Sequence, residues 1–350
     1  MGIVRFILAL SVVVAHTRPI FGYSLIGGNI SVNSFFIISG FYMAFILNEK
    51  YVGKNNSYLL FITNRFLRIY PIYWITLFFT ILISWSSFVS YEHSHNMVIS
   101  LVKNIALFPT IDYIFYQAKT YGGLFVYASW TLGLEFTFYL LAPFIVRKKL
   151  PLIIFLFIVS ILLRYHFTHP MRFPYQLDRF YVTVMIYFVL GILSYKLYLY
   201  INKFKINFRY VIAVCVIVVF LNVFYNYLPL PFRNLGGHGM LVQWEYYLIM
   251  AVSTPMLFIF SRIIKFDRVI GELSYPIYIT HALIIEVLGN IHFDMNNNTN
   301  KILAILITII TAVLLNKYIA APIEKYRQAR VKTTEDKRGV STVRLQSQAT

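Results

Sequence analysis

Two ionisable residues of the first apolar stretch, Arg5 and His16, have the types and the spacing expected for chemistry inside a membrane. They lie eleven positions apart in the sequence MGIVRFILALSVVVAHTRPI, and eleven residues of an α-helix make three turns plus about 20°. Both side chains therefore share one face, about 16 Å apart along the helix axis. Because a helix that only crosses lipid has no use for such groups, they indicate a polar path into the membrane.

Four further residues are predicted to lie near His16. Counted from the ends of their predicted helices, Glu135 lies at a similar height in the membrane, and Ser39 and His281 lie near its middle. A carboxylate beside an imidazole fixes the tautomer of that ring, as for a general base with an orienting acid. A structural ion pair between two helices explains Glu135 and His16 as well. Tyr278 shares a helix face with His281, which fits a structural hydrogen-bonded pair or a site.

Three arginines are expected together at the other end of the same helix. Residues 57–70 are too short and too basic to span a membrane, and we predict a separate interfacial helix there, with Arg65 and Arg68 on one side. Guanidinium groups bind phosphate in a bidentate manner. With Arg5 they could therefore hold a nucleotide or a pyrophosphate, although the ordinary excess of cytoplasmic positive charge also explains them.

The composition places these residues in a polytopic membrane protein. Of 350 residues, 59% are hydrophobic and 13% are charged, and the mean hydropathy is +0.68, whereas soluble domains carry about 25% charged residues. We predict an all-α fold with about ten transmembrane helices of roughly 20 residues each. The predicted spans are 3–20, 30–47, 71–90, 129–146, 150–167, 179–196, 209–228, 244–261, 271–290 and 301–320.

The net charge of +18 reflects the topology of the chain rather than nucleic-acid binding. The segments on the N-terminal side of the predicted spans hold 23 of the 31 Lys and Arg residues, and such residues are enriched in cytoplasmic loops. We therefore expect both termini in the cytoplasm, contact with the lipid bilayer, and no nucleic-acid partner. One membrane domain is predicted over 1–324, followed by a polar, disordered cytoplasmic tail over 325–350.

The longest predicted external segment is the loop 91–128. Its His93 and His95 have no further His or Cys nearby in the sequence, and no metal is expected. Aromatic residues near the outer face could stack on sugar rings or anchor the chain in the membrane interface. They are Tyr113, Tyr116, Tyr121, Tyr127 and Trp130.

Seven short motifs occur in order along the chain. They are Arg5 with His16, Phe35–Phe41 (FFIISGF), Arg65–Pro71 (RFLRIYP), Trp130–Phe136 (WTLGLEF), Phe188–Gly191 (FVLG), Ser274–His281 (SYPIYITH) and Pro322–Glu324 (PIE). Over residues 1–328, this ordered set resembles the acyltransferase family 3 integral-membrane proteins. Members of that family O-acylate surface polysaccharides, lipopolysaccharide O-antigens, nodulation factors and some antibiotics.

The resemblance implies an O-acetyltransferase of the inner (cytoplasmic) membrane. It implies acetyl-CoA as the cytoplasmic acyl donor and the hydroxyl of a lipid-linked or exported glycan as the acceptor. That glycan would be an O-antigen, capsule or exopolysaccharide unit, and polysaccharide-assembly proteins would be further partners. Arg5, Arg65 and Arg68 would then bind CoA.

The expected positions of the residues around His16 suggest roles for them in such a transfer. His16 would act as the general base, or carry the acyl group as a transient acyl-histidine. Glu135 would hold His16 in place. Ser39 and Tyr278 would donate hydrogen bonds to an oxyanion. His281 completes the expected catalytic set. Many relatives carry an additional extracytoplasmic SGNH-type hydrolase domain that completes the transfer. Here either the membrane domain transfers directly to the glycan or a separate protein completes the reaction, and we favour direct transfer.

The main alternative comes from another class of protein. A glycolipid or small-solute transporter or flippase also uses intramembrane His and Glu, as a proton relay. The two classes differ at the cytoplasmic arginines, because a carrier needs no phosphate-binding cluster there. The sequence therefore favours the enzyme and leaves the transporter as a second hypothesis.

Overall fold

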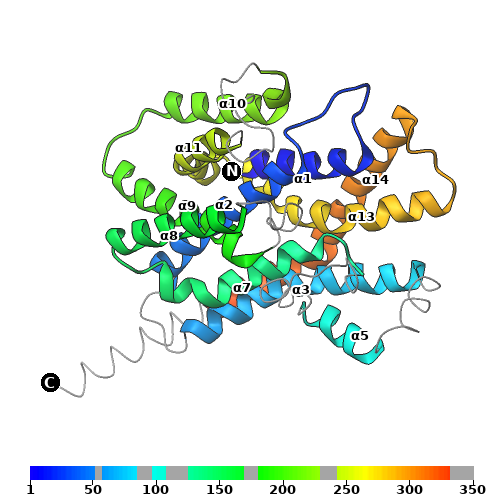
Figure 1. Ribbon diagram of the computed structural model, residues 1–350, viewed down its shortest axis with the longest axis horizontal. Helices are drawn as coiled ribbons and strands as arrows, with labels where there is room; N and C mark the ends of the chain where they lie inside the picture. Colours follow the sequence, from blue (N-terminus) through cyan, green and yellow to red (C-terminus); the bar gives the residue numbers. More distant parts are fainter. Residues whose placement is uncertain (52–56, 85–96, 108–124, 169–179, 229–242, 332–350) are drawn as a thin grey trace.

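The chain folds into a bundle of helices. The computed structural model describes residues 1–51, 57–84, 97–107, 125–168, 180–228 and 243–331, and within these ranges it contains helices and no β-strand (Figure 1). The elements are α1 (Gly2–Thr17), α2 (Gly28–Glu49), α3 (Ser57–Ile83), α5 (Met97–Ile105), α7 (Ser129–Ile145), α8 (Leu150–Thr168), α9 (Tyr181–Ile201), α10 (Phe208–Phe224), η2 (Tyr225–Tyr227), α11 (Trp244–Ile263), α12 (Lys265–Glu272), α13 (Ser274–Asn290), α14 (Asn298–Leu315) and the π-helical turn η3 (Asn316–Ala320).

Seven helical segments within the described ranges are long and apolar enough to cross a membrane. They are α2, α3, α8, α9, α10 with η2, α11, and the run that starts with α14 and ends at Val331. The other three predicted spans correspond to α1, α7 and α13, which have 16, 17 and 17 residues. The fold is therefore that of an all-α, multi-pass membrane protein, while ten spans and cytoplasmic termini stay predictions.

The helix α3 corrects one prediction. The sequence predicts a separate interfacial helix over 57–70, whereas α3 runs without a break from Ser57 to Ile83 and contains Pro71. A proline inside a helix removes one backbone hydrogen bond, a loss that helix bundles in membranes tolerate. Arg65 and Arg68 consequently lie on the same long helix as the apolar residues that follow them.

The first helix ends earlier than predicted, and this fixes the place of His16. Thr17 is the last helical residue, and Arg18 adopts a positive φ of 69°. Because a residue that precedes proline disfavours the helical conformation, Pro19 accounts for the end of the helix at this point. His16 therefore lies in the last turn of α1.

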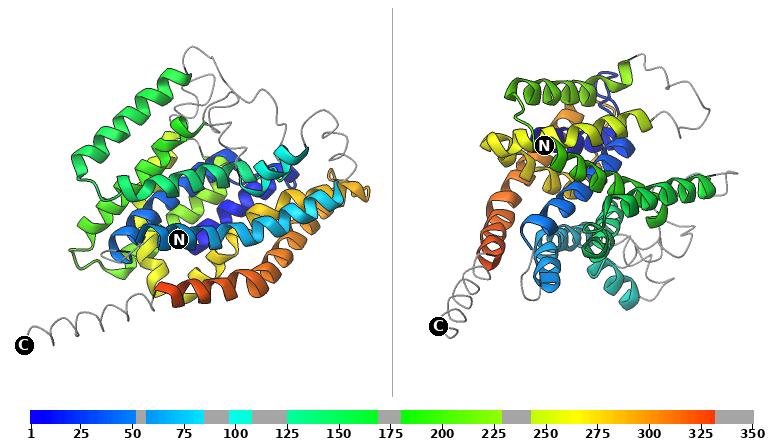
Figure 2. Two further views of the ribbon diagram at one scale, coloured as in Figure 1. Left: turned by 90° about the horizontal axis from the view of Figure 1, so that it is seen from below. Right: turned by 90° about the vertical axis from the view of Figure 1, so that its left-hand side faces the viewer.

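The helical run that starts with α14 continues beyond the predicted domain boundary at 324. After η3, residues 321–331 are again helical, and we call residues 321–331 the C-terminal arm (orange to red in Figure 2). Arg330 of the arm donates hydrogen bonds to Asn64 Oδ1 at 3.2 Å and to Thr63 Oγ1 at 3.1 Å. The first residues of the predicted disordered tail are thus a helix held against α3, and residues 332–350 lie outside the described part.

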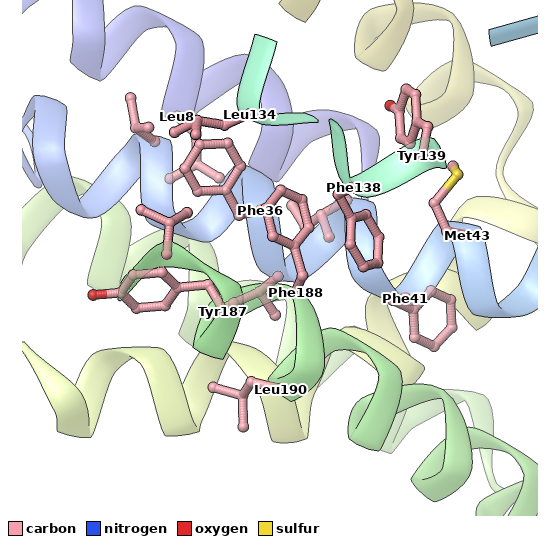
Figure 3. Packing of buried hydrophobic residues seen from close by; sticks show 14 of the residues in the cluster. Leu8, Phe36, Phe41, Met43, Leu134, Phe138, Tyr139, Tyr187, Phe188 and Leu190 are labelled. Carbon is pink, nitrogen blue, oxygen red and sulfur yellow. The ribbon is translucent and has the colours of Figure 1, made fainter. Parts of the chain in front are cut away.

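The centre of the core is the contact between α2 and α9, covered by α7. The ring of Phe188 on α9 lies 4.8 Å from that of Phe36 and 4.1 Å from that of Phe138, measured between ring centroids (Figure 3). All three side chains are buried. Burying aromatic side chains of this size is the main apolar contribution to such a core, and it holds α2 and α7 in place next to the pocket described below.

Two glycines allow α2 and α9 to approach closely. A Cβ atom built on Gly191 would lie 2.0 Å from the carbonyl oxygen of Ile37, and one built on Gly40 would lie 2.1 Å from that of Phe188. Small residues at such crossings let helix backbones touch in membranes. The glycines of the FFIISGF and FVLG motifs therefore have a packing role.

We expect Gly191→Ala to lower the free energy of unfolding by about 1–3 kcal/mol or more, because the added methyl group meets backbone that cannot move aside. Gly289→Ala is the matched control, since nothing lies within 4 Å of a Cβ at that helical position, and alanine favours helix there. Thermal unfolding in detergent measures both. Equal stability of the two variants would contradict this packing role.

Asp267 on α12 caps the start of α1. Its carboxylate accepts hydrogen bonds from the N–H groups of Gly2 at 2.7 Å and Ile3 at 2.8 Å, and from the Met1 amino group at 3.0 Å. Burial raises the pKa of Asp267, but the positive charge of the Met1 amino group and these hydrogen bonds outweigh burial, so the pKa is lowered overall. The end of α1 that carries Arg5 is thereby fixed to α12.

We expect Asp267→Asn to destabilise the fold by about 1–3 kcal/mol, because it weakens a buried, charge-assisted set of hydrogen bonds. Since the pKa is lower in the folded state, the ionised carboxylate stabilises the fold above its ordinary pKa of roughly 4, and this contribution is lost as the pH falls through the folded value. Thermal unfolding measures the stability of both proteins, and the difference between wild type and variant should become smaller as the pH is lowered from 7 to 3. The exposed Glu272, replaced by Gln, is the control, and a gap independent of pH would exclude this role.

Candidate active site

His16 of α1 lies against His281 of α13. The centroids of the two imidazole rings are 4.9 Å apart, and the ring of Tyr127 packs edge-on against His16 at 5.6 Å. His281 is fully buried, whereas His16 is exposed among the described residues. Two residues predicted to share a site, on helices far apart in the sequence, are therefore neighbours.

Backbone carbonyl groups orient both imidazole rings. The Nδ1 atom of His16 lies 2.8 Å from the carbonyl oxygen of Val12, and that of His281 lies 2.6 Å from the carbonyl oxygen of Tyr278. Because a carbonyl oxygen only accepts, each Nδ1 carries a proton, and in the neutral form of either ring the lone pair is on Nε2. The Nε2 atom of His281 is buried without a hydrogen-bond partner in the described part of the chain.

Glu135 has other partners than the predicted one. Its Oε1 atom accepts a hydrogen bond from Ser39 at 2.7 Å and another from Tyr139, one turn further along α7. No hydrogen bond between Glu135 and His16 is found among the described residues, and the acceptor that orients His16 is the carbonyl group of Val12. The two nearby hydroxyl groups satisfy the carboxylate locally, which explains the difference. The Ser39 proton is consequently directed at Glu135 rather than at an oxyanion.

A pocket of about 90 Å³ lies between α1, α2, α3, α7 and α13. Its polar lining includes Arg5, Ser39, Arg65, Arg68, Glu135 and Tyr278. Six of the eight predicted site residues therefore surround one cavity, and the other two, His16 and His281, lie just outside it. The structure brings the predicted residues together, while their roles stay predictions.

The guanidinium groups of the three arginines of this pocket make no hydrogen bond or salt bridge within the described ranges. Arg65 is buried, with 3% of its surface exposed, and its Nε atom has no hydrogen-bond partner among the residues that the structure describes. Its guanidinium lies over the rings of Phe61 at 5.6 Å and Tyr139 at 5.8 Å. Arg5 is half-buried and Arg68 is exposed. Guanidinium donors left without partners around a cavity suit a phosphate-bearing ligand.

Tyr278 belongs to the pocket and also lies next to His281. It lines the pocket, and the centroid of its ring lies 5.9 Å from that of His281. Its hydroxyl oxygen lies 2.9 Å from Thr131 Oγ1. A group bound in the pocket is therefore one side chain away from His281.

Three contacts of the site were outside the sequence prediction. Tyr139 lies four residues after Glu135, a helical spacing that would have indicated its contact with the carboxylate. Thr131 belongs to the WTLGLEF motif but has no charge to mark it. The Val12 carbonyl group has no sequence signal at all. His93, His95, Tyr113, Tyr116 and Tyr121 lie outside the described residues.

The helices and this pocket define a multi-pass membrane protein with a polar site inside its bundle. The chain belongs to acyltransferase family 3, because the model of that family, described as an acyltransferase domain, matches residues 1–318. No curated protein and no solved structure matches the chain. The resemblance carried by the seven motifs is thus confirmed, and the protein is a membrane acyltransferase.

Proposed function

We propose that this acyltransferase moves an acetyl group from acetyl-CoA to a hydroxyl of a cell-surface glycan, such as an O-antigen, capsule or exopolysaccharide unit. The observation that carries the proposal is the arrangement of the pocket, which joins a group of arginines to a tyrosine next to the histidine pair. It is lined by three arginines whose guanidinium groups have no hydrogen-bond partner among the described residues, and by Tyr278, whose ring lies next to that of His281 in the His16–His281 pair. A donor with phosphates at one end and a thioester at the other matches that arrangement.

The arginines bind the phosphates of acetyl-CoA from the cytoplasmic side of the inner membrane. Arg68 lies on α3 one turn closer to Pro71 than Arg65 does, and Arg5 reaches the same cavity from α1. Bidentate hydrogen bonds from these guanidinium groups to phosphate are strong. They would hold the donor so that its thioester extends past Ser39 toward Tyr278.

The chemistry takes place at His16. Its Nε2 atom removes the proton of the acceptor hydroxyl while the hydroxyl oxygen attacks the thioester carbonyl carbon. The new C–O bond forms, the C–S bond breaks, and the imidazolium returns its proton to the departing thiolate, which gives an acetyl ester and CoA. The unpartnered Nε2 of His281 accepts a hydrogen bond from the imidazolium and stabilises it.

Tyr278 controls the approach of the acyl group. Its ring lines the pocket and lies 5.9 Å from that of His281, so in this proposal the side chain rotates before the thioester reaches His16. In that rotated state its hydroxyl is the nearest candidate donor for the oxyanion. Ser39 could donate only after giving up its hydrogen bond to Glu135.

The acceptor approaches from the exposed side of His16. The ring of Tyr127, 40% exposed, packs against His16 and offers an apolar surface on which a sugar ring can lie. This arrangement lets donor and acceptor reach the histidines from opposite directions. Lipid-linked glycans and the proteins that assemble them are the partners that such a reaction requires.

NMR of surface polysaccharide from cells with and without the gene tests the proposal. Loss of O-acetyl signals from an otherwise unchanged glycan is the expected result, and it also identifies the sugar position. A transporter or flippase would instead change the amount or the length of the glycan. O-acetyl content that is the same in both strains would refute the proposed function.

A further inference from the structure

A fourth arginine, Arg327 of the C-terminal arm, lies within electrostatic range of Arg65 and Arg68 of the donor pocket. Arg327 is 7% exposed, and its Nε atom is buried without a hydrogen-bond partner in the described part of the chain. Its Nη1 atom forms a salt bridge with Glu324, one turn earlier on the arm. A buried guanidinium that leaves a donor unsatisfied is unfavourable unless a ligand completes it.

The charge around Arg327 is not balanced. Arg327 and Glu324 lie within electrostatic range of Arg65 and Arg68, and Arg68 also interacts with Glu135 and Arg5. Among these described residues four arginines face two carboxylates, which leaves an excess of two positive charges. Two of the four guanidinium groups, those of Arg65 and Arg327, are buried, and their Nε atoms have no hydrogen-bond partner in the described part of the chain. This arrangement indicates a binding site for a dianionic group.

The arm extends the row of arginines along α3. Arg68 lies nearest to Pro71, and Arg65 lies one turn further toward the start of α3. Arg330 holds the arm at the next two residues in that direction, Asn64 and Thr63. A CoA molecule with its thioester toward Tyr278 would place its pyrophosphate near Arg5 and Arg68. Its 3′-phosphate, at the far end of the molecule, would then reach the arm.

We propose that Arg327, together with Arg65, binds the 3′-phosphate of CoA, so that the C-terminal arm forms part of the donor site. The proposal rests on the proposed function, because it takes acetyl-CoA as the donor. Arg327 selects CoA over donors that lack this phosphate. An anionic lipid headgroup offers the same phosphate chemistry, and the experiment below separates the two sources.

The test measures the dissociation constants of CoA and 3′-dephospho-CoA for the full chain in phosphatidylcholine nanodiscs. We expect the wild type to bind CoA more tightly than 3′-dephospho-CoA. Arg327→Gln should weaken CoA binding by about 10- to 100-fold, the effect of losing one charge-assisted hydrogen bond, and leave the binding of 3′-dephospho-CoA within twofold of wild type. Arg327→Lys, which keeps the charge, should retain part of the preference for CoA.

Lys325→Gln is the matched control, since Lys325 is an exposed cation on the same arm and its loss should change neither constant. Equal binding of CoA and 3′-dephospho-CoA by the wild type, or equal weakening of both by Arg327→Gln, would overturn the inference while leaving the proposed function intact. If Arg327→Gln changes CoA binding only after phosphatidylglycerol is added to the nanodiscs, then Arg65 and Arg327 bind a lipid headgroup, and the inference is overturned. A wild type that binds neither compound would refute the proposed function itself.

Discussion

Replacing His16 with alanine is expected to lower the rate of acetyl transfer by about 10²- to 10⁴-fold, the usual contribution of a general base. His16 is the exposed member of the histidine pair, and its Nε2 lone pair is set by the hydrogen bond of Nδ1 to Val12. The measurement is transfer of radiolabelled acetyl from acetyl-CoA to glycan in membrane vesicles. CoA binding should stay unchanged, because His16 does not line the donor pocket.

The matched control for this prediction is His166→Ala. His166 is an exposed histidine in the last turn of α8, against Phe167, and its replacement should not change the rate of transfer. Both variants should reach the membrane in equal amounts. Full transfer by His16→Ala at normal protein level would remove His16 from the mechanism.

The second large effect is expected at the donor arginines. Arg65→Gln combined with Arg68→Gln should raise the dissociation constant of CoA by about two to four orders of magnitude, because each guanidinium contributes a charge-assisted hydrogen bond to phosphate. The same double variant should lose transfer at low acetyl-CoA and regain part of it at high concentration. Equilibrium binding of CoA to the purified protein measures the change directly.

A control separates a specific phosphate-binding site from general attraction of CoA by positive charge. Lys203→Gln with Arg209→Gln removes the same two charges from exposed positions around the start of α10, and we expect it to leave CoA binding within twofold. Arg65→Lys with Arg68→Lys keeps the charges but loses the planar guanidinium groups. Its dissociation constant for CoA should therefore lie between those of the wild type and of the double glutamine variant. CoA binding that falls equally in the Lys203–Arg209 variant would mean that long-range charge, not a site, attracts the donor.

The arrangement of helices follows from the sequence to a large extent, because apolar runs of the length of a membrane are strong signals. All ten predicted spans are helical over most of their length. The boundaries are less predictable. Pro19 ends α1 by its effect on Arg18, whereas Pro71 lies inside α3. The same residue type thus has opposite outcomes, and the packing of the neighbouring helices decides between them.

The site shows the same division between pattern and packing. The spacing of Arg5 and His16 and the ordered motifs selected residues that do lie around one pocket or next to it. The partner of His16 was mistaken, because hydrogen bonds to backbone carbonyl groups and the exact rotation of α7 leave no trace in a sequence. His281 rather than Glu135 lies beside His16.

The C-terminal arm was missed for a related reason. Its composition is polar and mixed in charge, which is typical of a disordered tail. Arg330 nevertheless bonds to α3 and Arg327 is buried, so charged residues that resemble a solvated tail are instead used in tertiary contacts. These contacts depend on Asn64 and Thr63 of α3, which lie next to the arm in the fold but far from it in the sequence.

A cryo-electron microscopy structure of the full chain with CoA bound tests most directly whether one cavity joins the arginines to the histidine pair. We predict phosphates in contact with Arg65 and Arg68, and the thiol beyond Ser39, directed at Tyr278 and the two imidazole rings. CoA bound elsewhere on the bundle, or a thiol that points away from Tyr278, would contradict the proposed path of the acetyl group.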